Sequence, residues 1–336
     1  MRLGVLDVGS NTVHLLVVDA HRGGHPTPMT SDKVELRLAE HLDPAGALTA
    51  AGAEALVGAV QRASAAAAEA GCADLLAFAT SALRDATNSS AVLAEVRHRT
   101  GVSLEVLPGE DEARYTFLAV RRWYGWSAGR LLVLDIGGGS LELAAGLDEH
   151  ADVAESLPMG AGRLTRQWFH SDPPSRHEID RLREHVDAQL APVARRLRRA
   201  GEPELAVGTS KTFRSLARLT GAAPSSAGPR ARRVLTRVGL RQLAAFITRM
   251  SSGDLAELEG VSPSRSHQLV AGALVAEAAM RALQVSQLEI CPWALREGVI
   301  LRRLDTLDGM SRIDRSAQEA LGGLGSLTSY EARWTG

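Results

Sequence analysis

The sequence predicts an α/β protein built from two related domains, and three observations support this fold class. The chain has 336 residues, which is more than one hydrophobic core usually supports. The run RLGVLDVGSNT at residues 2–12 is closely repeated as RLLVLDIGGGS at residues 130–140, which suggests a duplicated unit. Strand-like runs alternate with helical patterns of about ten or more residues, the order expected for a largely parallel sheet.

Both copies of the repeat are predicted to form β-hairpins. Each copy is an apolar run that ends in Asp and a glycine-rich turn. The residues after the turns, TVHLLVVDA and LELAAG, continue as strands rather than as a long helical face. These turns therefore differ from a Walker or dinucleotide-binding loop, which leads into a helix. Glycines in such a turn let successive backbone N–H groups point at one anion without obstruction by side chains.

The other expected elements follow along the chain. In the first half we expect a helix at residues 48–71, a strand at 73–80 and a loop at 81–90. A helix at 90–100, a strand at 102–108 and a helix at 111–124 are expected next. Gly71, Gly101 and Gly125 suit the ends of the three helices. In the second half we expect a helix at residues 173–200, a strand at 204–208, a helix at 209–221 and a flexible loop at 221–233. Further helices up to residue 282 and then a strand that leads into a last helix, at 288–304, are expected after the loop.

The glycines at residues 125 and 129 mark the expected boundary between the domains. We expect an N-terminal domain at residues 1–125 and a C-terminal domain at residues 126–305, with the last helix able to pack back on the first domain. Residues 306–336 show weak periodicity and many small side chains, so we expect a mobile tail there.

Composition excludes several classes of protein. The 38 basic and 39 acidic side chains leave a net charge of −1, which gives no reason to expect a nucleic-acid or membrane partner. Cys72 and Cys291 are too few for a disulfide framework or a zinc site. No apolar window approaches the roughly 20 residues that span a bilayer, and the chain runs from Met1 straight into a strand, unlike a signal peptide. We therefore expect a cytoplasmic protein.

Asp7 and Asp135 end the first strand of each hairpin, where a carboxylate can hold a metal ion that bridges phosphate oxygens. Asp135 is our first choice as metal ligand. Asp7 is the second, because a carboxylate that caps its own turn explains that residue equally well. Mg²⁺ (or Mn²⁺) is the expected ion, since the ligands are hard oxygens and Mg²⁺ keeps waters and phosphate oxygens in its shell.

The number and order of the motifs resemble those of the exopolyphosphatase and guanosine pentaphosphate phosphohydrolase family, and within it the short actinobacterial exopolyphosphatases. The motifs are DVGSNT, ATSALRDATN, LPGEDEARYTFLAV, DIGGGSLEL, SLPMGAGRLT, GTSKTFRSLA and ALREGVILRRL. The resemblance implies the actin, sugar kinase and Hsp70-like (ribonuclease H-like) fold, with two domains around a phosphate-binding cleft. None of the ten histidines is followed by Asp, so we expect no C-terminal extension of the His-Asp type that longer members carry.

The resemblance also implies roles for individual residues. Glu112 matches the family's catalytic glutamate and is our candidate for the base that activates water, although a helix N-terminus also favours acidic residues there. Glu142 resembles the second family carboxylate, with an ordinary strand glutamate as the alternative. N-capping explains Thr209 and Ser210 as well as a phosphate contact does. Phosphate contacts are expected from Gly9, Ser10, Asn11, Arg84, Gly137, Gly138, Gly139, Ser140, Thr209, Ser210 and Lys211.

The expected reaction is metal-dependent hydrolysis of the terminal phosphoanhydride bond of inorganic polyphosphate, with short chains preferred and orthophosphate released. Guanosine pentaphosphate, ADP or ATP are alternative substrates. A sugar or acetate kinase of the same fold would have no use for a water-activating Glu112, and a non-catalytic regulator would not depend on it. The resemblance suggests a homodimer. His14 is expected in the core, and Trp123, Tyr124 and Trp126 between the domains.

Overall fold

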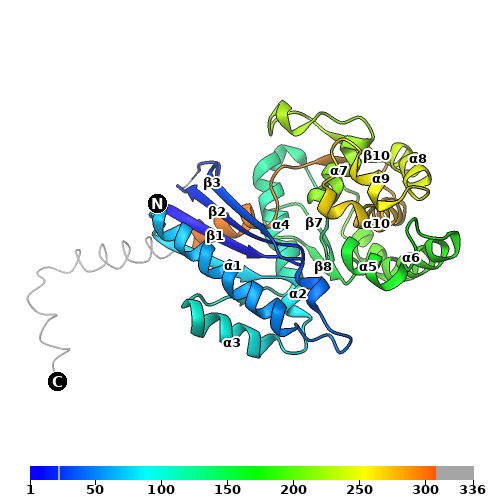
Figure 1. Cartoon of the computed structure of the whole chain (residues 1–336). Coiled ribbons are helices and arrows are strands. Elements are labelled where there is room, and N and C mark those ends of the chain that lie inside the picture. The colour runs from blue at the N-terminus through cyan, green and yellow to red at the C-terminus, as the bar shows by residue number, and fades with distance from the viewer. Residues whose placement is uncertain (22, 308–336) are drawn as a thin grey trace, which may run out of the picture.

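The computed structural model describes residues 1–21 and 23–307. These residues form two β-sheets, each with helices packed against it, as the α/β and two-domain prediction requires (Figure 1). Of the expected mobile tail, residues 306 and 307 continue the last helix, and residues 308–336 lie outside the described residues.

The first sheet contains both a hairpin and parallel strands. Its strands are β1 (Arg2–Val8), β2 (Thr12–Asp19), β3 (Pro28–Glu35), β4 (Asp74–Ala79) and β5 (Glu105–Val106). They lie in the order β3-β2-β1-β4-β5. β2 pairs antiparallel with β1 and β3, whereas β4 runs parallel to β1, and β5 parallel to β4. β3 was not among the expected elements, and β5 is much shorter than the expected strand at residues 102–108.

The second sheet repeats this plan. Its strands are β6 (Leu131–Ile136), β7 (Leu141–Gly146), β8 (Val153–Leu157), β9 (Leu205–Gly208), β10 (Val234–Thr236) and β11 (Gln287–Ile290). They lie in the order β10-β11-β9-β6-β7-β8. The β6–β7 hairpin is antiparallel and β9 runs parallel to β6, just as β4 runs parallel to β1. The prediction that both glycine turns lie in hairpins of a duplicated unit is therefore confirmed.

Helices surround both sheets. The α-helices are α1 (Ala50–Glu69), α2 (Ser81–Arg84), α3 (Ser89–Thr100), α4 (Gly109–Tyr124), α5 (Ala161–Trp168), α6 (Arg176–Arg199), α7 (Lys211–Leu219), α8 (Arg237–Ile247), α9 (Ser252–Ala256) and α10 (Leu269–Ala282). A last helix occupies residues 295–307. Short 3-10 helices are η1 (Leu38–His41), η2 (Trp126–Ala128), η3 (Ser225–Ala227) and η4 (Pro263–Gln268).

Local sequence explains where several helices begin and end. Ser175 and Glu178 form a reciprocal capping box at the start of α6, which satisfies two backbone donors that the first turn leaves free. Gly71 and Gly101 have φ values of +70° and +73° just after α1 and α3, so both predicted helix ends are confirmed. The expected loop at residues 81–90 is wrong in part, because α2 and the start of α3 lie within it.

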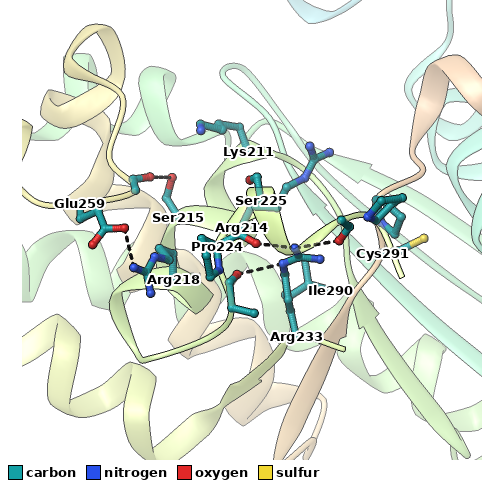
Figure 2. Close-up of a pocket in the computed structure, with 15 residues that line it drawn as sticks. Lys211, Arg214, Ser215, Arg218, Pro224, Ser225, Arg233, Glu259, Ile290 and Cys291 are labelled. Atoms are coloured by element: carbon teal, nitrogen blue, oxygen red, sulfur yellow. Dashed lines mark hydrogen bonds and ion pairs between the residues drawn. The ribbon is translucent and has the colours of Figure 1, made fainter. Parts of the chain in front are cut away.

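The predicted loop at residues 221–233 is anchored rather than free. Arg233 donates hydrogen bonds to four carbonyl oxygens of its own loop, at 2.6–3.0 Å. Figure 2 shows the guanidinium of Arg233 beneath this loop, between β11 and α7. An arginine that satisfies several buried carbonyls in this way restricts the conformations open to a Gly- and Pro-rich segment. The expectation of a flexible loop is therefore not supported within these residues.

α4 and the last helix each cover the sheet in the other half of the chain. Ala113 and Phe117 of α4 pack with Leu131 of β6, and α4 contacts β6, β7 and β8. In the last helix, Ile300 packs with Leu3 of β1. Packing thus differs from the expected split at residue 125, which assigns α4 to the first domain. An amphipathic helix shows from sequence that one face is buried, but not which sheet covers that face.

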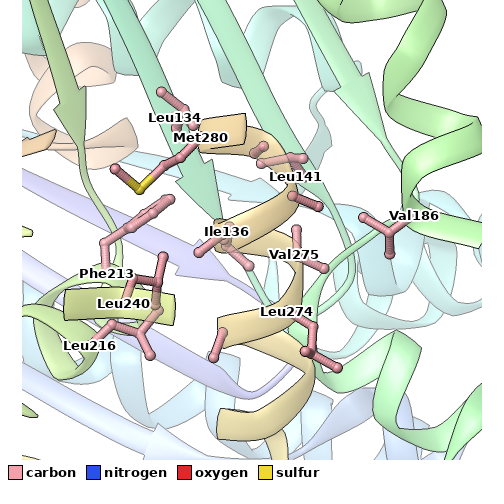
Figure 3. Packing of buried hydrophobic residues seen from close by; sticks show 14 of the residues in the cluster. Leu134, Ile136, Leu141, Val186, Phe213, Leu216, Leu240, Leu274, Val275 and Met280 are labelled. Carbon is pink, nitrogen blue, oxygen red and sulfur yellow. The ribbon is translucent and has the colours of Figure 1, made fainter. Parts of the chain in front are cut away.

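The core of the second half fixes the strand that carries Asp135. Leu134 and Ile136 of β6 are fully buried and pack in one cluster with α7 and α10. Figure 3 shows Met280 beside Leu134 and Val275 beside Ile136. Burying each large apolar side chain contributes about 1.5–3 kcal/mol relative to leaving it exposed. The end of β6 is therefore held firmly where the cleft begins.

No described helix is long and apolar enough to span a membrane.

Candidate active site in the cleft between the sheets

A cavity of about 330 Å³ lies between the two glycine turns. Most of the predicted site residues line this cavity. They are Asp7, Gly9, Ser10, Asn11, Glu112, Asp135, Gly137, Gly138, Ser140, Glu142, Ser210 and Lys211. Arg84, Gly139 and Thr209 stand directly behind the lining, where they contact Glu112, Ser81 and Asp135. The topology therefore brings residues from both halves of the chain to one place.

The two glycine turns have the same internal hydrogen bond. The N–H of Gly9 donates to Thr12 O, and that of Gly137 donates to Ser140 O, both at 2.9 Å. These two N–H groups close the turns and are not available to an anion, which corrects their expected role as donors to phosphate. The N–H groups of Ser10, Asn11, Gly138 and Gly139 have no partner within the described part of the chain. They remain as the anion-facing donors of the turns.

The turns approach each other so closely that side chains would separate them. A Cβ on Gly138 would lie 2.7 Å from Nδ2 of Asn11, and Ser10 Oγ lies 2.8 Å from Ser81 Oγ. A Cβ on Gly160 would collide with the backbone of Gly139. Glycine is needed where backbones pack at such distances. Gly160 supports the second turn from behind, a role that the sequence reasoning did not assign.

Four carboxylates from four elements form one end of the cavity. Asp7 and Asp135 are the next-to-last residues of β1 and β6, Glu142 lies on β7 and Glu112 on α4. Burial raises the pKa of Asp7, and raises the pKa of Asp135 to about 6 against the hydrogen bond from Thr209. The pKa values of Glu112 and Glu142 are also raised, first by burial and then by neighbouring carboxylates. Crowded buried anions of this kind favour uptake of a proton or a cation.

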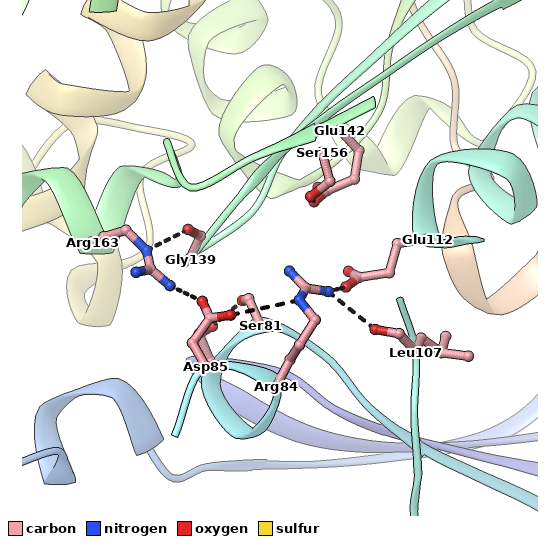
Figure 4. Close-up of polar contacts among 10 residues, drawn as sticks. Ser81, Arg84, Asp85, Leu107, Glu112, Gly139, Glu142, Ser156 and Arg163 are labelled. Carbon is pink, nitrogen blue, oxygen red and sulfur yellow. Dashed lines mark hydrogen bonds and ion pairs between the residues drawn. The ribbon is translucent and has the colours of Figure 1, made fainter. Parts of the chain in front are cut away.

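Besides Asp135, which accepts from Thr209, Glu142 and Glu112 have specific partners. Glu142 accepts a hydrogen bond from Ser156 Oγ at 3.0 Å. Glu112 pairs with the guanidinium of Arg84, which also donates to Leu107 O at 3.1 Å. Figure 4 shows Arg84 between Glu112 and Asp85, with Glu142 and Ser156 on the opposite side of the cleft. The pair opposes the rise in the pKa of Glu112.

Four basic side chains gather at the other end of the cavity. They come from β3, α7 and η4, and are Lys33, Lys211, Arg214 and Arg265. The pKa of Lys211 is lowered by burial and by the other three cations. No carboxylate of the described residues forms an ion pair with any of the four, and the buried Nε of Arg214 has no hydrogen-bond partner there. We call this group the basic end, and the four carboxylates the acidic end.

Sequence reasoning found only Lys211 of the basic end. Arg214 carried a signal, since it lies three residues after Lys211 in GTSKTFR and so on the same face of α7. Lys33 and Arg265 carried no signal in the sequence that points to a site.

His14 was expected in the core, and this was wrong: it lines the cavity and its Nε2 lies 2.6 Å from Ser31 Oγ. Alternation on β2 buries Val13 and Leu15 and turns His14 to the other face.

The expected helix N-terminus at residues 209–211 has mixed roles. Thr209 is buried and donates to Asp135, so it supports a carboxylate. Ser210 accepts from Phe213 N at 3.5 Å and caps α7, while Lys211 reaches the cavity.

Of the aromatic residues expected between the domains, Trp123 packs on Trp293 with ring centres 5.2 Å apart, where the chain passes from the second sheet to the last helix. Trp126, however, is 61% exposed.

A second cavity of about 380 Å³ adjoins the basic end and shares Lys211 and Arg214 with it. Figure 2 shows Lys211, Arg218 and Arg233 among the residues that line this chamber. Arg218 pairs with Glu259 at 2.5 Å, and the donors of Arg233 are held by loop carbonyls. The chamber keeps a positive charge, because carbonyls do not neutralise a guanidinium, but the donors of these two arginines are largely occupied.

The described residues contain no group of three or more His, Cys, Asp or Glu side chains arranged to hold a metal ion. Asp7 and Asp135 are two oxygen donors at matching positions of the duplicated hairpins. A hard cation such as Mg²⁺ is often held by one or two carboxylates, with waters and substrate phosphates completing its shell. This donor set fits such an ion.

Comparisons with known proteins agree with this geometry. A model of the Ppx/GppA phosphatase family matches residues 17–307. Exopolyphosphatase 1 of Mycobacterium tuberculosis (strain ATCC 25618 / H37Rv) is 64% identical over 318 residues, which cover 94% of this chain and 92% of that protein. Exopolyphosphatase 1 of Mycobacterium leprae (strain TN) is 61% identical over 323 residues, covering 96% and 95%.

A solved structure shares the fold. The crystal structure of an exopolyphosphatase from Cytophaga hutchinsonii matches with a TM-score of 0.82 and 22% identity, over 91% of this chain and 98% of that one. The actin-like fold expected from the sequence is thereby confirmed.

Proposed function

The chain belongs to the Ppx/GppA phosphatase family, and from this premise we propose that it is an exopolyphosphatase, which hydrolyses the terminal phosphoanhydride bond of inorganic polyphosphate and releases orthophosphate. The observation that carries the proposal is the lining of the cavity, which combines four carboxylates with Lys33, Lys211, Arg214 and Arg265, cations that have no ion-pair partner among the described residues. A chain of phosphates can place its reacting end among the turns while later phosphates meet the cations.

In this proposal the glycine turns bind the terminal phosphate. Ser10 and Asn11 from the first turn and Gly138 from the second line the cavity, and their N–H groups have no partner among the described residues. Donors that are already fixed in place stabilise the charge of the reacting phosphoryl group without reorganising. Ser140 Oγ and Arg84 are further donors at the same end. Phosphoryl transfer depends mainly on such positioning and charge neutralisation.

We propose Glu112 as the base that takes a proton from the attacking water. Its raised pKa makes the carboxylate a better proton acceptor than an exposed glutamate, provided that it is ionised. Arg84 favours the ionised form, because it pairs with the carboxylate. Glu142, held by Ser156, lies across the cleft and orients the water.

Mg²⁺ or Mn²⁺ is the proposed cofactor, held by Asp135 and Asp7. Burial raises the pKa of both carboxylates although nearby arginines oppose the rise, and neither forms an ion pair with a basic side chain of the described residues. When bound, the ion neutralises phosphate oxygens as a Lewis acid. Thr209 then keeps Asp135 oriented toward the cavity through its hydrogen bond.

The decisive experiment measures orthophosphate release from short and long polyphosphate with Mg²⁺. Glu112→Gln is expected to lower kcat by about 10²–10⁴-fold, the usual contribution of a general base. Glu110→Gln is the matched control, since Glu110 lies in the same helical turn but its side chain is 61% exposed. No release from polyphosphate by the unaltered protein would overturn the proposal. Full activity of Glu112→Gln would overturn the role of Glu112 as the base, whereas a non-catalytic regulator would bind polyphosphate without releasing orthophosphate.

A second candidate substrate, guanosine pentaphosphate, is favoured by the cavity beside the basic end. Its lining includes the apolar side chains of Pro224, Ile290 and Pro292, which a nucleoside can contact. The donors of Arg218 and Arg233 there are largely occupied by Glu259 and by loop carbonyls. A nucleoside there would leave its phosphates over Lys211 and Arg214. Ser225→Trp would fill this chamber. We expect it to abolish any hydrolysis of guanosine pentaphosphate while polyphosphate hydrolysis continues, and equal loss of both would show that the chamber does not distinguish them.

A further inference from the structure

Arg163 and Asp85 form an ion pair that joins the two halves of the molecule. Asp85 follows α2 beside the first sheet, and Arg163 lies on α5 beside the second. The Nε of Arg163 also donates to Gly139 O at 2.8 Å. Arg163 therefore connects the second glycine turn to α2, as Figure 4 shows.

The connection continues from Asp85 to the proposed base. Arg84 Nε lies 3.6 Å from Asp85 Oδ1, and the same guanidinium pairs with Glu112. The side chains of Arg163, Arg84 and Glu112 are only 21%, 22% and 8% exposed, so solvent screens these contacts less than it screens a surface pair. Four charged groups thus lie in a row between Gly139 and Glu112. We call this row the relay.

α2 depends on such outside contacts for its position. It is a single turn of four residues, and a helix of that length is not stable by its own hydrogen bonds. Ser81 at its start is tied to Ser10 of the first glycine turn. Asp85 at its end is tied through Arg163 to the second turn. The position of Arg84 is therefore set jointly by both turns.

We propose that Arg163 and Asp85 are positioning residues, which hold Arg84, and through it Glu112, in register with the second glycine turn. This inference rests on the proposed function. Neither side chain lines the cavity itself, although the backbone N–H of Arg163 donates to Gly138 O at 2.8 Å. Their effect is to keep the base and the phosphate-binding turn at a fixed separation when the two halves close on substrate. The reaction needs this alignment more than substrate binding does, because the turns and the basic end bind the phosphates independently.

Steady-state kinetics with short polyphosphate test the relay. We expect Asp85→Asn and Arg163→Met each to lower kcat by about tenfold to 100-fold, because small misplacements of catalytic groups have effects of this size, with KM changed by less than about threefold. The double variant should lose no more than the worse single variant, because both act through one row of contacts. Arg281→Met is the matched control, since it breaks the Arg281–Asp187 pair on the surface between α10 and α6.

Kinetic results also define what would overturn the relay. The proposed positioning role is contradicted if the unaltered protein is active and both single variants keep kcat within about twofold. It is also contradicted if the two losses of activation free energy add in the double variant. A rise in KM at constant kcat would likewise assign the two residues to substrate binding instead of positioning.

Hydrogen exchange tests the same inference without relying on activity. The N–H groups of Leu83, Arg84 and Asp85 bond to Thr80 and Ser81 carbonyls within α2. We expect peptides that cover residues 80–88 to exchange at least about fivefold faster in Arg163→Met, while peptides of α10 are unchanged. Unchanged amide exchange around α2 in Arg163→Met would overturn the proposal that Arg163 holds α2 in position. If the unaltered protein releases no orthophosphate, the proposed function fails separately, and the exchange result still decides whether Arg163 holds α2.

Discussion

The acidic and basic ends of the cavity are built in different ways. The carboxylates of the acidic end follow or lie on elements of the duplicated hairpins and on α4, within motifs that are recognisable in the sequence. The cations of the basic end come from an outer strand, a helix start and a 3-10 helix, at residues 33, 211, 214 and 265. Burial raises pKa values at the first end and lowers them at the second.

This difference suggests a division of labour along the proposed polyphosphate chain. The acidic end carries buried charge that is costly unless a cation or a proton compensates it. The basic end carries cations that repel one another, and Glu35 opposes this repulsion at Lys33 and Arg265 without forming an ion pair, so an anionic ligand would stabilise them further. The first should therefore control the chemical step, and the second the binding of phosphates beyond the one that reacts.

Asp135→Asn is the strongest test of the acidic end. Loss of the charge that we assign to metal binding should reduce kcat by about 100-fold or more, since metal neutralisation of phosphate oxygens contributes several kcal/mol. Phosphate release should recover only in part at high Mg²⁺. The measurement is a Mg²⁺ titration of kcat, with Asp148→Asn, whose carboxylate lies outside the cavity, as the control. Unchanged Mg²⁺ dependence would remove Asp135 from the metal site.

The double variant Arg214→Gln/Arg265→Gln tests the basic end. We expect KM for polyphosphate of many units to rise by about tenfold with little change in kcat, and the salt dependence of KM to weaken. Tripolyphosphate, which is too short to use the whole basic end, should be affected less. Arg249→Gln, on the surface beyond α8, is the control. A fall in kcat for both substrates would contradict the proposed division between the ends.

The acidic end should also make stability depend on pH in the metal-free protein. The folded-state pKa of Asp135 is raised to about 6 from 3.8, so the folded state holds this proton more tightly than the unfolded state. Stability is therefore gained as pH falls from about 8 to 5, by about 1.4 kcal/mol. Urea unfolding in EDTA at several pH values between 5 and 8 measures this gain. An equally steep dependence in Asp135→Asn would assign the effect to other groups.

Thr209→Val is expected to have the smallest effect. The isosteric change removes the hydroxyl that donates to Asp135, a bond that lowers the pKa of that carboxyl. We expect a fall of about threefold in kcat near pH 7 and a smaller one at higher pH, where Asp135 is ionised in any case. A pH profile of kcat for the two proteins provides the measurement. A loss that does not diminish at high pH would indicate a packing defect instead.

Particular residues show why one part of the site could be predicted and the other could not. Asp7 and Asp135 stand beside glycines at strand ends, a local pattern that also predicts where the side chains meet. Lys33 and Arg265 are separated by more than half the chain and sit in no motif, so only the arrangement of β3 and η4 reveals them. Arg163 and Asp85 look like ordinary helix residues until the structure places them against each other.

The sequence by itself determined the α/β class, the duplicated hairpins that carry Asp7 and Asp135, and the helix ends at Gly71 and Gly101, because each depends on neighbours within a few residues. Glu112 and Glu142 were predicted from the resemblance of the motifs, and their roles stay predictions. Only the tertiary structure decided that α4 and the last helix exchange sheets, that the basic end exists, and that Gly139 is connected to Glu112. These features depend on which buried faces and charges meet across the cleft, and a periodic pattern shows that a face is buried without showing its partner.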